Sequence, residues 1–131
     1  MANTLETGKK LVELCRQGKY LDAVDTLYSK DIVSIEAKGD AAMPARTQGI
    51  EAIRGKNKWW MENHEIHGNE VKGPFPHGDR FVALMKMDVT PKAGPHAGKR
   101  MQFEEAALYT VRDGKIVREE FFYDMGGDAG A

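Results

Sequence analysis

The sequence predicts an α+β fold, in which N-terminal helices pack on a mainly antiparallel sheet. Three observations carry this prediction. Apolar residues recur at three- and four-residue steps in the first half of the chain, which is typical of amphipathic helices. Glycines and prolines between residues 68 and 78 rule out a long helix there. The strands predicted further on follow one another without intervening helices, which excludes a parallel doubly wound sheet.

The first half begins with two short predicted helices. Leu11, Leu14 and Cys15 follow helical spacing, and Gly18 ends this first helix. A second apolar stripe follows at helical spacing and predicts a second helix. The stripe consists of Tyr20, Leu21, Val24, Leu27 and Tyr28.

A strand, a loop and a third helix are predicted next. Residues 31–36 alternate in polarity and carry β-branched side chains, so they predict a strand. Residues 37–48 contain glycine, proline and several alanines, and they predict a loop. A third helix is expected to begin near Gly49. One face of it carries Ile50, Ile53, Asn57, Trp60 and His64.

The second half is predicted to form strands. A long strand at residues 81–89 precedes a connecting loop at 91–98. Two more strands are expected at 101–111 and 115–125. Asp113-Gly114 between them is a strong hairpin signal, because both central residues of a type I′ turn need a positive φ.

A two-residue turn pairs Arg112 with Lys115 and so predicts which side chains share a face. One face then carries Phe103, Glu105, Ala107, Tyr109 and Val111, with Ile116, Arg118, Glu120, Phe122 and Asp124. The other carries Gln102, Glu104, Ala106, Leu108 and Thr110, with Val117, Glu119, Phe121 and Tyr123. Both faces mix apolar and charged groups, whereas a sheet with one wet face alternates more cleanly. We therefore expect helices to cover one face and a second subunit to cover the outer one, as a homodimer.

Composition narrows the class of protein. The chain has 131 residues, which predicts a single domain over 1–131, with residues 1–4 and 126–131 frayed. A net charge of −1 argues against nucleic-acid binding, and no apolar run is long enough to cross a membrane. The first residues lack the pattern of a signal peptide, and the single cysteine, Cys15, cannot form an internal disulfide. We expect a cytoplasmic protein without a metal or nucleotide cofactor.

Carboxylates are concentrated on the last two predicted strands, in the pairs Glu104-Glu105 and Glu119-Glu120. If the face with Glu104 and Glu119 is covered, desolvation should raise the pKa of these two carboxyl groups. A carboxyl group with a raised pKa can serve as a general acid or base near neutral pH. The alternative is that all four carboxylates are solvated or pair with Arg112, Lys115 and Arg118.

Three segments resemble the SnoaL-like branch of the nuclear transport factor 2-like superfamily. The segments are residues 18–36, residues 49–53 and residues 111–124, beginning GKYLDAV, GIEAI and VRDGKIV respectively. The resemblance implies a cone-shaped fold, in which a curved sheet wraps round helices and a pocket opens at one end. Ketosteroid isomerases, polyketide cyclases, limonene epoxide hydrolases, dehydratases and non-enzymatic binding domains share this fold, so the fold alone does not give the function.

The resemblance also implies roles for individual residues. Glu36 falls at the position of the catalytic base of ketosteroid isomerases, but Val12 and Ala106 fall where those enzymes carry oxyanion donors. A steroid isomerase is therefore not expected. Asp124 resembles the acid/base aspartate of polyketide cyclases. The pocket-facing positions of the last strand are Glu119, Phe121 and Tyr123, which favours Glu104, Ala106 and Leu108 as their inner partners. Phe121 replaces the last aspartate of the epoxide hydrolases, which argues against their chemistry.

Several side chains are candidates for ligand contact. Trp60 can form a wall of the pocket and stack on a flat ligand, although a core tryptophan would give the same pattern. His64 is either an acid/base group or a helix C-terminal residue favoured by the helix dipole. Met85 and Met87 suit an adaptable apolar pocket, with core packing as the alternative. Tyr28 and Phe121 complete the predicted ligand-binding set.

Together these observations predict a SnoaL-like domain that binds a small hydrophobic molecule. If it is an enzyme, we expect cofactor-free acid–base isomerisation, cyclisation or dehydration of a carbonyl compound. Glu36 would then be the base, Glu119 or Glu104 the proton partner, and Tyr123 a hydrogen-bond donor. A pocket of roughly 300–1,000 Å³ that both Glu36 and a second carboxylate reach would favour this hypothesis. The alternative is a non-catalytic ligand-binding or dimerisation module.

Overall fold

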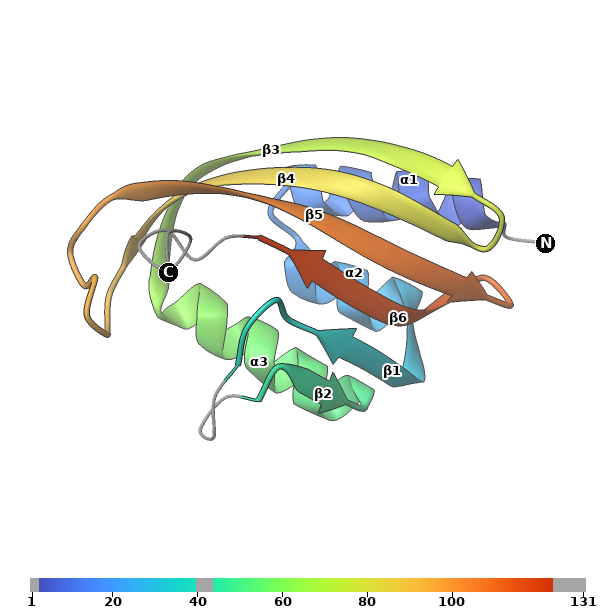
Figure 1. The fold of residues 1–131 in the computed structure, drawn as a ribbon, viewed down its shortest axis with the longest axis horizontal. Coiled ribbons are helices and arrows are strands. Elements are labelled where there is room, and N and C mark those ends of the chain that lie inside the picture. Colours follow the sequence, from blue (N-terminus) through green and yellow to red (C-terminus); the bar gives the residue numbers. More distant parts are fainter. Residues whose placement is uncertain (1–2, 40–43, 124–131) are drawn as a thin grey trace.

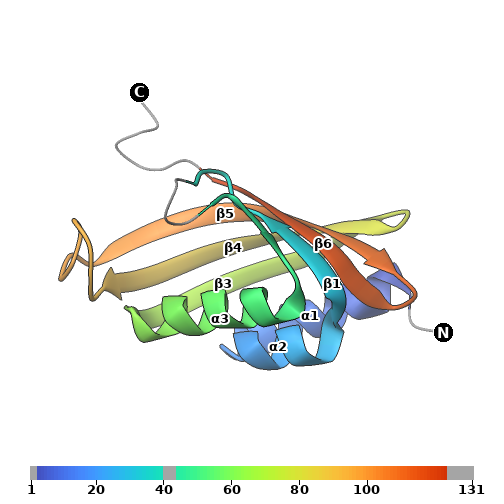
Figure 2. The same ribbon diagram turned by 90° about the horizontal axis from the view of Figure 1, so that it is seen from below.

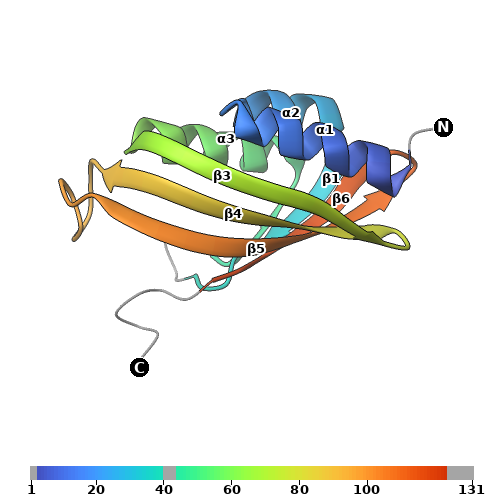
Figure 3. The same cartoon turned by 90° about the horizontal axis from the view of Figure 1, so that it is seen from above.

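A curved sheet with helices on its concave side makes up the computed structural model, which describes residues 3–39 and 44–123 (Figure 1). Within these residues, three helices lie on one face of a six-stranded sheet, as Figures 2 and 3 show from opposite sides. The elements are α1 (Thr4–Arg16), α2 (Tyr20–Leu27), β1 (Tyr28–Ile35), β2 (Arg46–Gln48), α3 (Ile50–Glu62), β3 (His64–His77), β4 (Arg80–Pro91), β5 (Met101–Arg112) and β6 (Lys115–Phe122). The α+β prediction is confirmed.

The strands are ordered β2-β1-β6-β5-β4-β3 across the described sheet. β1 and β6 pair in parallel, and every other neighbouring pair is antiparallel. The long strands β3, β4 and β5 bend over the helices, so that α1, α2 and α3 are enclosed on one side (Figure 2). A cavity lies between the helices and this concave face.

The first helix begins earlier than its apolar stripe indicates. The side chain of Asn3 accepts a hydrogen bond from the Glu6 backbone N–H at 2.9 Å, so it caps the helix at its N-terminus. Residues 3 and 4, which we expected to fray, therefore belong to the cap and first turn, whereas 126–131 lie outside the described residues. Gly18, with φ of 74°, ends the helical segment as predicted.

Tyr28 belongs to a strand, which corrects the prediction that it continues the second helix. α2 ends at Leu27, and β1 begins three residues before the predicted strand. Tyr28 pairs with Ile116 of β6, and its side chain is buried. Helical spacing could not reveal this, because parallel pairing with the last strand joins residues far apart in the chain.

β3 is a long strand in the region where the sequence only excluded a helix. His64 begins it, although we expected this residue on the third helix, which ends at Glu62. The pairing of β3 with β4 shifts between Ile66 and Gly68 and again between Lys72 and Phe75. These irregularities accommodate the glycines and prolines that argue against a regular strand.

The β5–β6 hairpin has the predicted turn but a different register beyond it. Asp113 and Gly114 have φ values of 52° and 76°, and Arg112 pairs with Lys115. A bulge at Val117 then shifts the pairing by one residue, so that Tyr109 rather than Leu108 lies opposite Glu119. A one-residue shift turns the side chains of one strand over relative to the other. The predicted grouping of faces is therefore wrong beyond the bulge.

The core lies between the helices and the concave face of the sheet. Phe81 and Tyr109 stack there with ring centroids 4.8 Å apart, and both are almost fully buried. Ile32, Ile53 and Ile116 have no exposed surface. Burial of each such side chain stabilises the fold by about 1.5–3 kcal/mol, which fixes the sheet and helices that carry the site.

Candidate functional site

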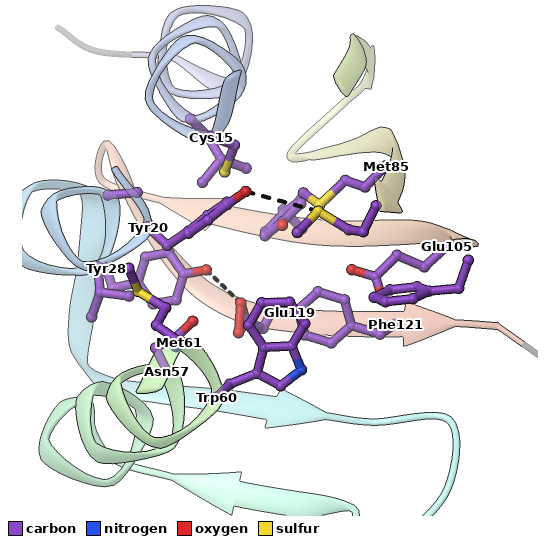
Figure 4. A pocket seen from close by; sticks show the side chains of 16 residues that line it. Cys15, Tyr20, Tyr28, Asn57, Trp60, Met61, Met85, Glu105, Glu119 and Phe121 are labelled. Atoms are coloured by element: carbon purple, nitrogen blue, oxygen red, sulfur yellow. Dashed lines mark hydrogen bonds between the residues drawn. The ribbon is translucent and has the colours of Figure 1, made fainter. Parts of the chain in front are cut away.

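A cavity of about 140 Å³ lies between the three helices and the concave face of β4, β5 and β6 (Figure 4). Its walls are largely apolar and include Leu11, Val24, Trp60, Met61, Met85, Met87 and Phe121. Polar side chains also line it, namely Cys15, Tyr20, Tyr28, Asn57, Glu105, Tyr109 and Glu119. An apolar cavity with a few convergent polar groups is the usual form of a small-molecule site.

Glu119 is the most deeply buried carboxylate of the described chain. It is 2% exposed, the Tyr28 hydroxyl donates a hydrogen bond to its Oε1, and the Ser34 hydroxyl donates another. Ser34 lies beside Glu119 because the two residues pair in the parallel β1–β6 ladder. Burial raises the pKa of the Glu119 carboxyl to about 7, although the hydrogen bonds and the Lys56 ammonium oppose this rise.

Glu105 lies on the neighbouring strand, and its carboxyl group points into the same space (Figure 4). Among residues 3–39 and 44–123, no hydrogen bond or ion pair to this carboxyl group is found. Burial raises its pKa to about 7, and the negative charges of Glu36 and Glu119 contribute to the rise. Two carboxyl groups that titrate near neutral pH therefore share one apolar cavity.

A chain of polar contacts connects Glu119 with the surface. Lys56 on α3 donates to Ser34 Oγ at 3.2 Å and forms an ion pair with Glu36 at 2.8 Å. The Tyr123 hydroxyl donates to Glu36 Oε2 at 3.0 Å. Lys56 is thus held between the buried carboxylate on one side and a partly exposed one on the other.

The structure places some of the predicted site residues together and separates others. Those that line the cavity are Tyr28, Trp60, Met85, Met87, Glu119 and Phe121. Glu36 and Tyr123 line a separate groove beside the ends of β1 and β6. His64 stacks on Trp60, with ring centroids 4.3 Å apart, and does not line the cavity. Asp124 lies outside the described residues.

The prediction that Glu104 faces inward is wrong. The bulge at Val117 places Glu105 on the concave face beside Glu119, so that Glu104 faces outward. The Glu104 side chain is 75% exposed and lies 3.8 Å from Lys86. Ala106 likewise lies on the outer side, in a groove with Leu84 and Phe122.

Sequence reasoning missed several residues of the site, namely Tyr20, Lys56, Asn57 and Glu105. Glu105 could have been found only by weighing both faces of the hairpin, since no turn residue marks the bulge. Tyr20 is part of the predicted apolar stripe, and its hydroxyl group is the feature that could have marked it as a polar residue of the site. Lys56 is on the third helix, one position before the Asn57 that the helical face already included.

Residues 3–39 and 44–123 contain no group of three or more histidine, cysteine, aspartate or glutamate side chains arranged to hold a metal ion. In the same described part of the chain, no helix has the length and apolar character needed to span a membrane.

Comparison with known proteins establishes the family. The model of the SnoaL-like domain matches residues 2–123, so the chain belongs to the SnoaL-like family. A crystal structure from Mesorhizobium loti is 44% identical in sequence, with a TM-score of 0.82, and the match covers 90% of this chain and 97% of that one. That protein is provisionally described as a SnoaL-like polyketide cyclase, and its description also carries the words carbohydrate phosphatase.

More distant structures share the fold. A nuclear transport factor 2-like protein of unknown function from Burkholderia pseudomallei is 16% identical, with coverage of 97% and 95% and a TM-score of 0.76. An epoxide hydrolase of the limonene epoxide hydrolase-like type from Mycobacterium tuberculosis is 18% identical, with coverage of 94% and 79% and a TM-score of 0.67. No functionally curated protein matches the chain significantly. Family and fold are thus shared with these proteins, whereas the cavity is a feature of this chain's own residues.

Proposed function

We propose that the cavity binds a small apolar molecule and that Glu105 and Glu119 transfer protons to and from it without a cofactor. The observation that supports this most directly is that the carboxyl groups of Glu105 and Glu119 line the same apolar cavity, where burial raises the pKa of each to about 7. Such groups are half protonated near neutral pH, where general acid–base catalysis is most effective. Since each charge disfavours the other, the pair readily holds a single proton.

One carboxylate can then act as base while the other acts as acid. Proton removal next to a carbonyl and proton return at another atom amount to isomerisation, and the same two steps serve cyclisation or dehydration. The description of the Mesorhizobium loti protein as a polyketide cyclase is compatible with this class of reaction. Glu36, which we predicted as the base, is instead proposed to hold Lys56 through their 2.8 Å ion pair.

Solvent deuterium exchange tests this proposal without the natural substrate. The probe is 2-indanone in D₂O, and loss of its α-proton signal is followed by proton NMR. We expect the wild-type protein to accelerate exchange, and Glu119→Gln and Glu105→Gln each to slow it by roughly 100-fold, a usual contribution of one acid–base group. Glu104→Gln is the matched control, because Glu104 lies on the outer face. Exchange rates that do not differ between the inner variants and the control would contradict the proposal.

The size of the cavity favours a second candidate, a binding module without catalysis. A volume of about 140 Å³ is well below the roughly 300–1,000 Å³ of sites for drug-sized ligands. Three methionines line the space, and their side chains can adapt to a ligand. Saturable binding of 2-indanone without accelerated exchange would favour this second candidate.

We also propose that two copies associate through the outer face of the sheet. Leu84, Ala106 and Phe122 lie side by side on adjacent strands, and Leu84 and Phe122 are 43% and 55% exposed. Phe75, which is 53% exposed, lies nearby on β3 opposite Val82. A row of large exposed apolar residues is typical of an interaction surface. Sedimentation velocity should give a dimer for the wild type and a monomer for Leu84→Lys, and a monomeric wild type would overturn this proposal.

A further inference from the structure

Asn69 on β3 fixes the direction of a hydrogen bond at the edge of the cavity. Its side-chain Nδ2 is 2.9 Å from the Cys15 carbonyl oxygen and 2.7 Å from the Tyr20 hydroxyl oxygen. A carbonyl oxygen can only accept, so the end of the amide that faces Cys15 must be the NH₂ group. The same NH₂ group donates to Tyr20, and the Tyr20 oxygen is therefore the acceptor of this bond.

This arrangement leaves the proton of the Tyr20 hydroxyl for another partner. In the described part of the chain, its acceptor is Met87 Sδ at 3.8 Å, and a thioether sulfur is a weak acceptor. Burial raises the pKa of Tyr20 above its ordinary value of 10, so the hydroxyl keeps its proton at neutral pH. Tyr20 projects from the start of α2 into the cavity, toward a methionine sulfur (Figure 4).

We propose that the Tyr20 hydroxyl anchors an acceptor oxygen of the ligand and that Asn69 is the positioning residue that orients it. The ligand class is a small apolar compound with a carbonyl-type oxygen. An oxygen acceptor would replace the weak contact with Met87, and the apolar remainder would lie among the methionines and Trp60. This inference rests on the proposed function, because it needs the cavity to bind a ligand.

The ligand class follows from the polar groups available to it. The Tyr20 hydroxyl accepts a hydrogen bond from Asn69 and can donate its own proton to a ligand, whereas Glu105 and Glu119 are the proposed proton-transfer groups. A hydrocarbon ligand has no acceptor, so the Tyr20 hydroxyl would keep its weak hydrogen bond to the Met87 sulfur and would add nothing to the binding free energy. A ketone or aldehyde would satisfy that donor while its adjacent C–H bonds lie in the same cavity as the two carboxyl groups.

A pair of isosteric probes tests this inference. Acetophenone and α-methylstyrene have the same shape and differ in an oxygen in place of a CH₂ group. Their dissociation constants are measured by NMR titration of the methionine methyl signals. We expect Tyr20→Phe to weaken acetophenone binding about fivefold, as for the loss of one neutral hydrogen bond, and to leave α-methylstyrene unchanged.

Asn69→Asp tests the positioning role with almost no change in size. The new carboxylate accepts from the Tyr20 hydroxyl and so draws its proton away from the cavity. The binding of acetophenone should again weaken, while the binding of α-methylstyrene stays unchanged. Circular dichroism shows whether the variant is folded. If it is not folded, the Tyr20→Phe variant decides the test. Equal effects on the two probes, or no effect on either, would overturn the inference and leave the proposed binding intact. Failure of both probes to bind the wild type would overturn the proposed function as well.

Discussion

The two faces of the β5–β6 hairpin both carry glutamates, but the environment of these carboxyl groups differs between the faces. Glu104 and Glu120 face outward, where Glu104 lies 3.8 Å from Lys86 and Glu120 lies 2.6 Å from Arg118. Glu105 and Glu119 face the cavity, and burial raises both of their pKa values to about 7. Residues next to each other in the chain therefore have different chemistry, because the sheet separates a wet environment from an apolar one.

The comparison teaches that the position of a bulge decides which glutamate faces the cavity. Without the bulge at Val117, regular pairing would group Glu119 with Glu104. With it, Glu119 and Glu105 face the same cavity. The candidate site therefore depends on one irregular residue in the ladder, and variants that address each face separately should show how far the two faces differ.

The largest difference is expected in packing. Phe81→Ala should lower the free energy of unfolding by about 3–5 kcal/mol, because Phe81 is 1% exposed and stacks on Tyr109. Phe122→Ala should change it by less than about 0.5 kcal/mol in the monomer, since Phe122 is 55% exposed. Urea denaturation at low protein concentration measures both values. Similar losses for the two variants would mean that the outer face is as well packed as the core.

The next difference concerns pH. Because the pKa of the Glu105 carboxyl is raised from 4.5 to about 7, the folded chain binds this proton more tightly than the unfolded chain. The resulting stabilisation is complete below pH 4.5 and is lost as the pH rises through about 7. We expect Glu105→Gln to reduce the fall in unfolding free energy between pH 4.5 and pH 8 by about 3 kcal/mol.

Glu104→Gln is the control for this pH effect, because its carboxylate is largely exposed. It should leave the pH dependence of the unfolding free energy unchanged. Thermal or urea unfolding at a series of pH values gives the comparison. An equal change in slope for Glu104→Gln and Glu105→Gln would contradict the assignment of the two residues to opposite faces.

Much of the fold could be predicted from local patterns. Helical spacing located the helices, and Asp113-Gly114 located the hairpin, because each signal depends on residues close together in the chain. The limits of β1 could not be predicted in this way. Tyr28 belongs to a strand only because β6, near the other end of the chain, is available to pair with it.

The apolar residues that line the candidate site could be predicted from the sequence, whereas its carboxyl groups were predicted less well. Trp60, Met85 and Phe121 were expected at the cavity and line it. Glu104 was chosen instead of Glu105 because regular alternation was carried past a bulge that no glycine marks. Glu36 was expected to share a pocket with a second carboxylate, but its ion pair with Lys56 holds it in the adjacent groove.

A smaller effect is expected from the cation beside the inner face. Lys56→Met should raise the pKa of Glu119 by roughly one unit, because the Lys56 ammonium stabilises the ionised carboxylate. The pKa is measured from the pH dependence of the Glu119 carboxyl signal in carbon-13 NMR. Lys58→Met is the matched control, since Lys58 is exposed on the same helix. If neither substitution changes the pKa of Glu119, the Lys56 ammonium does not stabilise the ionised Glu119 carboxylate.

The smallest effect is expected from the charges of the outer face. Lys86 and Glu104 are 3.8 Å apart, and their side chains are 47% and 75% exposed. Solvent screens such a pair, so a double-mutant cycle with Lys86→Ala and Glu104→Ala should give a coupling free energy below about 0.5 kcal/mol. The cycle is measured by urea unfolding at low and high salt. A coupling above about 1 kcal/mol that persists in high salt would mean that the outer face is desolvated, as it would be in a dimer, and the contrast between the faces would then hold only for the isolated chain.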